Sequence, residues 1–120
     1  MNTINSFHVE QIGDATVVRL TNSDFKDTVI NQQFCQSLLQ HIEATNPSRL
    51  IISMGEVEAL TSDTITALLR ARAQVLHLNG SMELCEVGSD VMEVLKLLDL
   101  PGKVFPVHKN EKNAVRSSGF

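Results

Sequence analysis

Aromatic residues and clustered positive charge are scarce in this sequence of 120 residues, which has no tryptophan, no tyrosine and five phenylalanines. Proteins that hold bases or sugars commonly stack them on aromatic side chains, so the composition argues against such a platform. The ten Lys and Arg residues are scattered singly, and the formal net charge is −4. Because no basic stripe is present to neutralise phosphates, we expect neither nucleic acid nor an anionic membrane as a partner.

Long hydrophobic runs are also lacking. No window approaches the roughly 20 apolar residues that span a bilayer, and "MNTINSFHVE" lacks the basic and apolar regions of a signal peptide. We therefore expect a cytoplasmic protein without membrane insertion.

Cysteine is equally rare, since Cys35 and Cys85 are the two in the chain and lie in apolar contexts without a C-x-x-C spacing. This pattern predicts buried, reduced thiols.

The residues that usually carry catalysis or bind cofactors form no pattern. The six glycines make neither a P-loop nor G-x-G-x-x-G, which argues against a nucleotide cradle. The carboxylate pairs Glu56 with Glu58 and Glu83 with Glu86 are more simply solvated faces than acid/base pairs. The histidines stand apart from metal-ligand spacing, at His8, His41, His77 and His108. We expect no metal, no cofactor, no catalytic residues and no enzymatic activity.

What the sequence does contain is an alternation of short β-rich runs and amphipathic stretches. Runs at 7–12 and 15–20 flank Gly13-Asp14 and predict a β-hairpin. Apolar residues at four-residue spacing, Phe34, Leu38 and Ile42, predict a helix over 30–44. The remaining elements are a buried strand over 49–54, a helix over 63–78, a strand over 82–87, a helix over 90–98 with Ser89 as its N-cap, and a last short strand within 103–108.

The predicted order is β-β-α-β-α-β-α-β. It indicates one α/β domain, with a core over about 7–108 and a flexible tail over 109–120 that forms one helical turn at most. Its sheet is mixed, with four to five strands, an initial antiparallel hairpin and helices packed against it. In such a sheet the loops after the strands gather on one edge, the usual place for a ligand or partner. These loops are "TNSDFKD" (21–27), "GEVEALTSD" (55–63) and "VGSD" (87–90).

One helix start on this edge is crowded with oxygen-bearing side chains, at Thr61, Ser62, Asp63 and Thr64. Thr61 or Ser62 can cap the helix by accepting a hydrogen bond from a backbone amide, and Asp63 complements the positive end of the helix dipole. This structural role needs no further function. A hydroxyl at an exposed helix start is also a good phosphorylation site, because free amides and the dipole favour the added negative charge.

At this point the sequence resembles a known family. The succession "RLIISMGEVEALTSDTITALLRARAQVLHLNGSMELCEVGSDVMEVLKLLDLPGKVFPVH" is similar to the core of the STAS domain family of bacterial anti-sigma factor antagonists. Members show an apolar strand, a Gly-Val-x-x-φ loop, a D-S-S-G segment that opens a long helix, a G-G-x-φ-x-φ-x-φ strand, a helix with a Leu-rich end and a final φ-F-x-φ strand. The resemblance covers nearly the whole chain and implies a STAS-type fold.

The resemblance places the family's phosphorylated serine at Ser62, when the two patterns are aligned without a gap. A rival register uses Asp63-Thr64 and makes Thr64 the phosphorylated residue, but it requires a deletion of two residues before "NGSMELCEV". The chain departs from D-S-S-G on either side of Ser62, because Thr61 replaces the acid, Asp63 the second serine and Thr64 the glycine. The missing acid puts recognition by the usual serine kinase in doubt.

By resemblance, the chain is a stand-alone regulator that binds an anti-sigma factor with serine kinase activity, and phosphorylation at Ser62 weakens that contact. Residues on the neighbouring loops are expected to flank Ser62 as partner contacts, namely Asp24, Asp27 and Ser89, together with Thr61, Asp63 and Thr64. The alternatives are an interaction module without a phosphoswitch, as a subunit of a signalling scaffold or transport complex, and a small-molecule or nucleotide binder. A weak homodimer is compatible with all of them.

Overall fold

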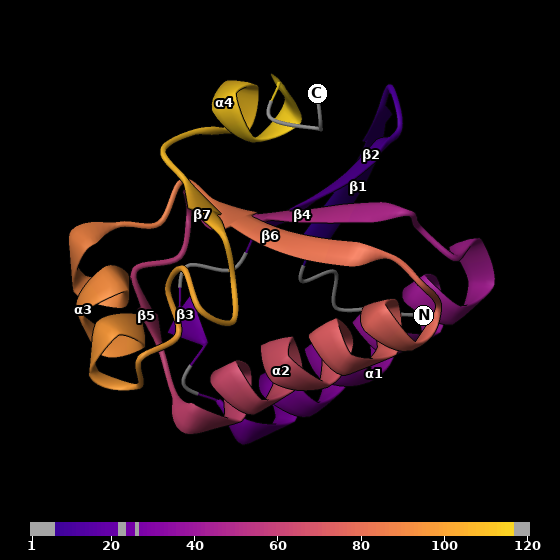
Figure 1. Ribbon diagram of the computed structural model, residues 1–120. Coiled ribbons are helices and arrows are strands. Elements are labelled where there is room, and N and C mark those ends of the chain that lie inside the picture. The colour runs from indigo at the N-terminus through magenta and orange to yellow at the C-terminus, as the bar shows by residue number, and fades with distance from the viewer. Residues whose placement is uncertain (1–6, 22–23, 26, 117–120) are drawn as a thin grey trace.

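A mixed five-stranded sheet forms the centre of the molecule and carries helices on both faces (Figure 1). The structure is a computed structural model and describes residues 7–21, 24–25 and 27–116. The strand order is β1-β2-β4-β6-β7, in which β1 is antiparallel to β2 and the other neighbours are parallel. The strands are β1 (Phe7–Ile12), β2 (Ala15–Leu20), β4 (Arg49–Ser53), β6 (Ser81–Cys85) and β7 (Val107–His108). The prediction of a mixed sheet that begins with a hairpin is confirmed.

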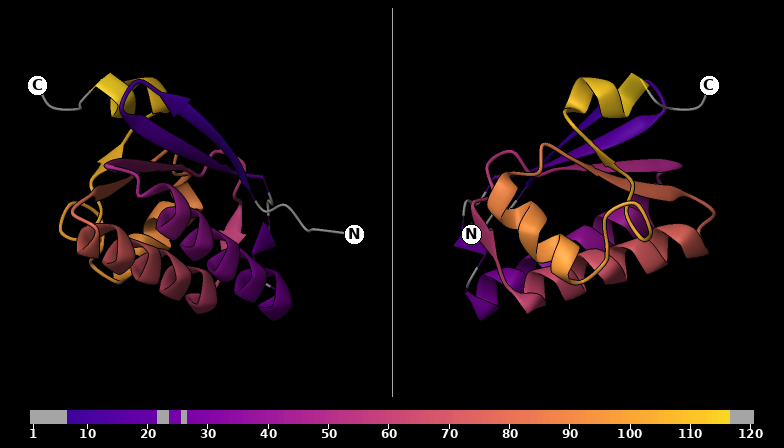
Figure 2. Two further views of the ribbon diagram at one scale, coloured as in Figure 1. Left: turned by 90° about the vertical axis from the view of Figure 1, so that its right-hand side faces the viewer. Right: turned by 60° about the vertical axis from the view of Figure 1, so that its left-hand side comes forward.

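Two long helices cover one face of this sheet. Helices α1 (Thr28–Thr45) and α2 (Ser62–His77) lie side by side beneath it, whereas α4 (Glu111–Arg116) lies on the opposite face (Figures 1 and 2). Helix α3 (Ser89–Leu97) lies beyond the carboxyl ends of β4 and β6. Beside it, β3 (Asp24–Phe25) and β5 (Ala59–Leu60) form a separate parallel pair. These two strands of two residues each were not foreseen from the sequence.

The main core fills the space between the sheet and the helix pair α1–α2. Strand β4 is buried along its whole length, as its apolar sequence predicts. Helix α1 presents Phe34, Leu38 and Ile42 to the core, at the spacing noted in the sequence. On α2 the small residues Ala67 and Ala71 are buried beside Leu68, whereas Leu69 and Leu76 are exposed. The buried face of α2 therefore includes small alanines, and two of its leucines lie outside that face.

The close turn after α2 explains one glycine. A Cβ atom at Gly80 would lie 2.5 Å from the carbonyl oxygen of Pro47 and 2.9 Å from Cγ1 of Val75. The left-handed residue that ends the helix is the preceding Asn79, with φ 67°. Asn79 therefore ends the helix, and Gly80 serves close packing rather than a left-handed turn.

A second, smaller core lies under α4. It consists of alternate residues from the other side of the strands, Ala15, Val17, Ile51 and Cys85, with Ala114 from α4. The Cys85 thiol is buried there, and desolvation raises its pKa to about 12. Cys85 is therefore a neutral packing residue at any physiological pH.

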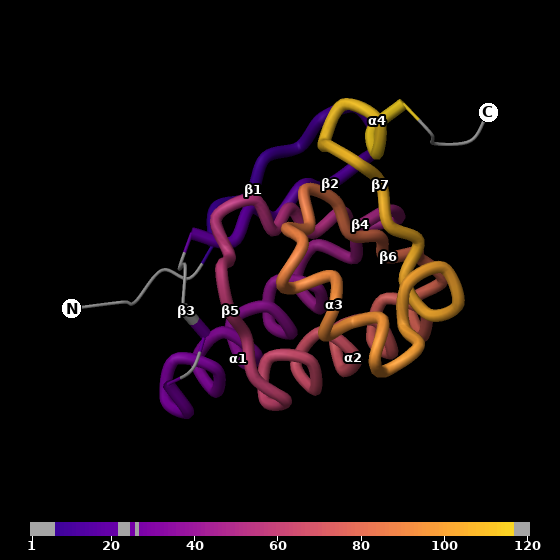
Figure 3. Tube along the Cα trace, turned by 90° about the vertical axis from the view of Figure 1, so that its left-hand side faces the viewer, coloured from indigo at the N-terminus to yellow at the C-terminus, as the bar shows by residue number. Residues whose placement is uncertain are grey.

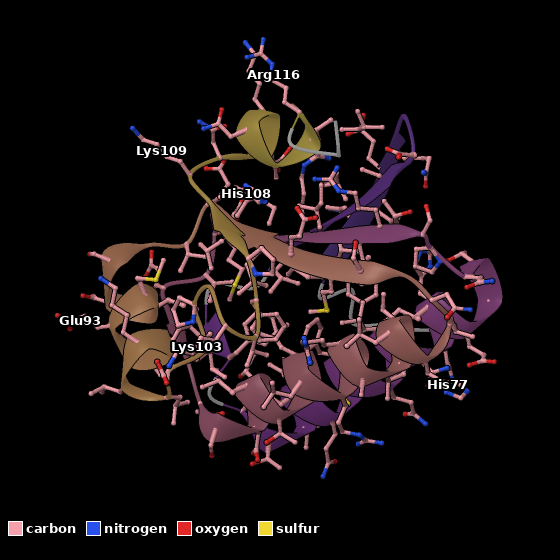
Figure 4. All side chains as sticks on the ribbon, viewed as in Figure 1. His77, Glu93, Lys103, His108, Lys109 and Arg116 are labelled. Atoms are coloured by element: carbon pink, nitrogen blue, oxygen red, sulfur yellow. The ribbon has the colours of Figure 1, made fainter. Side chains whose placement is uncertain are left out.

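Charged side chains of the sheet hold both ends of α4. The Arg49 guanidinium, 7% exposed, donates to the carbonyl oxygens of Ala114 and Val115 at the end of the helix and pairs with Glu83 at 2.9 Å. Figure 4 shows His108 beneath α4, and its Nε2 lies 2.8 Å from Oε1 of Glu83.

At the other end of α4, Glu86 accepts a hydrogen bond from the N–H of Glu111 at 3.0 Å. The Glu111 carboxylate pairs with both Nε and Nη2 of Arg19, at 2.9 and 3.0 Å. The interpretation of Glu83 and Glu86 as solvated carboxylates is therefore wrong, because both groups have fixed partners. The tail was expected to form one turn at most, and α4 spans six residues that these contacts stabilise.

Candidate functional site

The carboxyl ends of β4 and β6 bring three chain segments together at one edge of the molecule. Residues 54–61 lead from β4 into α2, residues 86–88 lead from β6 into α3, and β3 pairs with β5 just before α2 begins. Figure 3 looks onto this edge, where α3, β5 and the start of α2 lie in front. The backbone of Asp24 pairs with Ala59 in β3–β5. We call this surface, made by residues 55–63 and 88–94, the docking edge.

A buried polar network fixes the start of α2. Thr61 is the N-cap, and its N–H donates to Oγ1 of Thr64 at 3.3 Å. The Thr64 hydroxyl is fully buried and lies 2.7 Å from Oδ1 of Asn31 on α1. Asn31, 2% exposed, donates from Nδ2 to the carbonyl oxygen of Phe25 in β3 at 2.8 Å. One network therefore ties α2, α1 and β3 together.

Ser62 differs from its hydroxyl-bearing neighbours. It is the first residue of α2 and is exposed, and its side chain makes no hydrogen bond to any residue that the structure describes. Thr61 and Thr64 direct their hydroxyls inward, toward the carbonyl oxygen of Phe25 at 3.4 and 3.2 Å. The cap that the sequence allowed at Thr61 or Ser62 is Thr61, which leaves the Ser62 hydroxyl open to solvent.

The other predicted contact residues have local structural roles. Asp27 is the N-cap of α1 and accepts hydrogen bonds from the N–H groups of Val29 and Ile30, at 2.7 and 3.3 Å. Ser89 was expected to cap α3, but Gly88 is the N-cap and Ser89 is the first helical residue. Both side chains are exposed near the docking edge, so neither is excluded from a partner by burial.

Asp63 lines a groove of about 370 Å³ between α1 and α2. Cys35 and Arg70 also line this groove, and Nη1 of Arg70 lies 3.7 Å from the sulfur of Cys35. Both cysteines are free thiols. The prediction that both are buried holds for Cys85 and is wrong for Cys35, which is partly exposed because it lies at the border of the buried stripe of α1.

Two adjoining grooves of about 230 and 330 Å³ run along the docking edge, between residues 55–60 and α3. Val57 and Val91 form their apolar floor, and the exposed carboxylates Glu58 and Asp90 stand at the rim. No lysine or arginine lines either groove. The sequence indicated Ser89 here but missed Glu58 and Asp90, because the contact between the two loops depends on the crossover from β4 to β6.

The described part of the chain offers little for other kinds of site. It contains no group of three or more His, Cys, Asp or Glu side chains arranged to hold a metal ion. Among the described helices, none is long and apolar enough to cross a bilayer. The arrangement at the docking edge, an exposed hydroxyl beside a shallow acidic groove, is suited to contact with another macromolecule rather than to enclosure of a small ligand.

Several solved structures superpose on this fold. An anti-sigma-factor antagonist (STAS) domain protein from Planctomyces limnophilus superposes with a TM-score of 0.79 at 20% identity, over 92% of this chain and 95% of that one. The anti-sigma factor antagonist SpoIIAA in its unphosphorylated form gives 0.76 at 17% identity, over 95% and 97%. A chain of the stressosome, described as a signal integration and transduction hub, gives 0.68 at 17% identity, over 91% and 93%.

The TM-scores establish a shared fold, and the search of curated proteins found no match. The family assignment comes from the sequence, because the STAS domain pattern matches residues 6–114, nearly the whole chain. The same span holds the five strands, the first three helices and the docking edge. The chain therefore belongs to the STAS domain family, whose fold it shares with the anti-sigma factor antagonists.

Proposed function

We propose that this protein is a cytoplasmic regulator of the anti-sigma factor antagonist kind and not an enzyme. Its partner is an anti-sigma factor with serine kinase activity, which docks on the edge around Ser62. In the unphosphorylated state the docking edge holds the anti-sigma factor and so releases a sigma factor. Phosphorylation of Ser62 by the same partner weakens the contact and reverses the effect.

The observation that carries this proposal is the exposure of the Ser62 hydroxyl at the first position of α2. Thr64, the alternative acceptor, is fully buried and hydrogen-bonded to Asn31, so a kinase reaches it only if the start of α2 opens. Ser62 needs no such opening. The buried network of Thr61, Thr64 and Asn31 holds the helix start that carries Ser62, which lowers the entropic cost of docking.

A phosphate on Ser62 is compatible with the folded helix. The first N–H groups of α2 have no partner within the helix, and the helix dipole favours negative charge there. The modification adds a charge of about −1.5 to −2 near neutral pH. Because Asp63 and Glu58 are exposed nearby, the added charge enlarges an acidic surface and repels any acidic group that the partner brings to it. The switch therefore acts by electrostatics and desolvation, without unfolding.

The test is phosphate transfer in a purified system. The protein is incubated with ATP and the anti-sigma kinase encoded in its own genome, and modified residues are mapped by mass spectrometry. We expect transfer to wild type, loss of transfer to Ser62→Ala and unchanged transfer to Ser37→Ala. Ser37 is a suitable control because it is an exposed serine in the middle of α1, outside the docking edge. Transfer that persists in Ser62→Ala, or no transfer to wild type, contradicts the phosphoswitch.

A second candidate is an interaction module without a phosphoswitch. It is favoured by the departures from the D-S-S-G pattern at Thr61, Asp63 and Thr64, and by the likeness of the fold to a stressosome chain. Under this candidate the docking edge still binds a protein, but Ser62 accepts no phosphate. Binding that is indifferent to Ser62→Asp, together with no transfer, would support it.

A further inference from the structure

Strand β1 leaves one side of the sheet open. It is the first strand in the order β1-β2-β4-β6-β7, so β2 is its only hydrogen-bonded neighbour in this sheet of the described chain. Residues His8 to Gln11 are all exposed, and Val9 is 40% exposed. In Figure 3, β1 lies on the opposite side of the sheet from β7. An edge strand of six residues presents a row of unpaired N–H and C=O groups.

Three usual protections of an exposed edge, proline, lysine and a β-bulge, are missing from β1, and Glu10 is its one charged carboxylate. Its sequence, FHVEQI, has neither proline nor lysine. All six residues pair with β2 in an unbroken register, from Phe7 with Leu20 to Ile12 with Ala15, so no bulge turns the edge away. The opposite edge differs, because β7 has two residues. Of the two edges that the described residues give this sheet, the β1 edge is therefore the one long and regular enough to accept another strand.

The hairpin geometry determines which backbone groups of β1 face outward. Residues 13 and 14 form a two-residue turn, so the closing pair Ile12 and Ala15 is of the hydrogen-bonded type. Pair types alternate along an antiparallel ladder. His8 and Glu10 therefore bond toward β2. The N–H and C=O groups of Phe7, Val9 and Gln11 point to the open edge.

We propose that β1 pairs with β1 of a second copy of this chain, antiparallel and centred on Val9. In this register Val9 faces the partner's Val9, and Phe7 faces the partner's Gln11. All three outward-pointing residues then find outward-pointing counterparts, which gives about six hydrogen bonds between the copies. The two sheets continue into one sheet of ten strands with twofold symmetry.

Side-chain charge selects the same register. With Val9 at the centre, His8 of each copy lies opposite the partner's Glu10, on the same face of the joined sheet. Glu10 already pairs with Arg19 at 2.7 Å, which orients its carboxylate along this face. A pairing centred on Glu10 would still join Val9 to the partner's Gln11, but it would place two carboxylates opposite each other and leave Phe7 without a strand partner, which gives about four hydrogen bonds instead of six. The register centred on Val9 therefore gives the most backbone hydrogen bonds and places His8 opposite the partner's Glu10.

This contact is small, because it joins two strand edges rather than two broad faces. Interfaces of this size bind weakly, so we expect a dimer that forms and dissociates with concentration. The backbone groups of β1 that pair lie outside the docking edge, although His8 shares a pocket with Gly55 and Glu56 at the end of that edge remote in sequence from Ser62. The dimer is consequently independent of the proposed phosphoswitch, and failure of either proposal leaves the other standing.

The experiment measures molar mass by sedimentation and light scattering over a range from about 10 µM to about 1 mM. We expect the mass of wild type to rise with concentration from 13.2 kDa toward twice that value. Val9→Lys places two positive charges opposite each other and should weaken association at least tenfold, roughly the effect of 1.4 kcal/mol. Val29→Lys is the matched control, since Val29 is an exposed valine on α1, and it should associate like wild type.

A cross-link tests the register directly and does not depend on the folding of Val9→Lys. In a Cys35→Ser background, Val9→Cys should form a disulfide-linked dimer under mild oxidation, because paired Cα atoms about 5.5 Å apart suit a disulfide. Val29→Cys in the same background should not. A wild-type mass that stays at one chain over the whole range, or a Val9→Cys variant that cross-links no more than Val29→Cys, overturns the proposal.

Discussion

Asn31 is the residue that holds three segments together behind Ser62. Its amide accepts from Thr64 and donates to the carbonyl oxygen of Phe25 in a site that is almost closed to water. Buried polar groups cost little when every member is paired and much when one partner is removed. The start of α2, which presents Ser62 to solvent, is therefore held by a residue 31 positions before Ser62 in the sequence.

Loss of this amide should be costly. We expect Asn31→Ala to lower the free energy of unfolding by about 1–2 kcal/mol, because Thr64 and Phe25 lose buried partners while alanine slightly favours the helix. The measurement is urea denaturation followed by circular dichroism. Gln32→Ala, at an exposed neighbouring position of α1, should change stability by less than about 0.5 kcal/mol. Equal effects of the two variants would show that the network carries no stability.

The two thiols should react at different rates. Cys35 is partly exposed, whereas Cys85 is buried and its pKa is raised to about 12. We expect one thiol to react quickly with a thiol-specific reagent at pH 8, and the second only as the protein unfolds. Cys35→Ser should abolish the fast reaction, and a fast reaction that survives this change would contradict the burial of Cys85.

Folding raises the pKa of Cys85 above the usual value near 9. The free energy of unfolding should therefore fall as the pH rises beyond 9, because the unfolded chain loses this proton first.

At the scale of elements, α4 shows how tertiary contacts make a short helix. Six residues are too few for a stable isolated helix. Glu86, which follows β6, and Arg19 of β2 contact Glu111, the first residue of α4. Arg49 of β4 contacts the last carbonyl groups of α4. Negative charge near the start of a helix and positive charge near its end both interact favourably with the helix dipole. The helix therefore exists because the sheet offers partners for both ends.

The pair of Glu111 and Arg19 gives a pH-dependent contribution. Its hydrogen bonds to Arg19 hold the pKa of Glu111 below its usual value. This stabilisation is present above the pKa of the unfolded state, near 4.5, and is lost as pH falls through the lowered folded pKa. Because both side chains are partly exposed, Glu111→Gln should lower the free energy of unfolding by only about 0.5–1 kcal/mol at pH 7 and by little at pH 2.

Denaturation of wild type and variant at both pH values provides the measurement. Glu93→Gln on α3 is the control, since Glu93 is exposed, and it should show a difference near zero at either pH. Figure 4 shows Glu93 on the outer side of α3, remote from α4. A difference between wild type and Glu111→Gln that stayed constant down to pH 2 would contradict the assigned ion pair.

Element order and sheet type could be predicted from the sequence, because they depend on local patterns. Alternating apolar residues with Gly13-Asp14 indicated the hairpin, and Phe34, Leu38 and Ile42 indicated the inner face of α1. What could not be predicted rests on contacts between distant segments. The pair β3–β5 is too short to leave a pattern, and α4 depends on arginines of β2 and β4.

The candidate site divides in the same way. A hydroxyl cap at Thr61 or Ser62 follows from local chemistry, but the choice of Thr61 became clear only from the structure. The burial of Thr64 could not be predicted, since its partner Asn31 looks like an ordinary polar residue of α1. The carboxylates Glu58 and Asp90 meet only because β4 and β6 are neighbours in the sheet. Ser89 was given a cap role because serine is a frequent cap, but the backbone turns one residue earlier, at Gly88.

The whole molecule separates its surfaces by their position on the sheet. The carboxyl ends of the parallel strands form the docking edge, the open side of β1 forms the proposed dimer contact, and α4 closes the face opposite α1 and α2. One packed core connects these surfaces, and a phosphate on Ser62 would have free amides at the helix start to receive it. The proposed switch therefore works by a local change of charge, with no rearrangement of the fold.

The most direct test of this claim is the affinity of the anti-sigma partner for the protein with a fixed negative charge at position 62, measured by titration calorimetry. Ser62→Asp should weaken binding at least tenfold, equivalent to about 1.4 kcal/mol, because the charge falls within the contact. Ser37→Asp, at an exposed site in the middle of α1, should leave the affinity unchanged. Equal affinity for wild type, Ser62→Asp and Ser37→Asp would contradict the account.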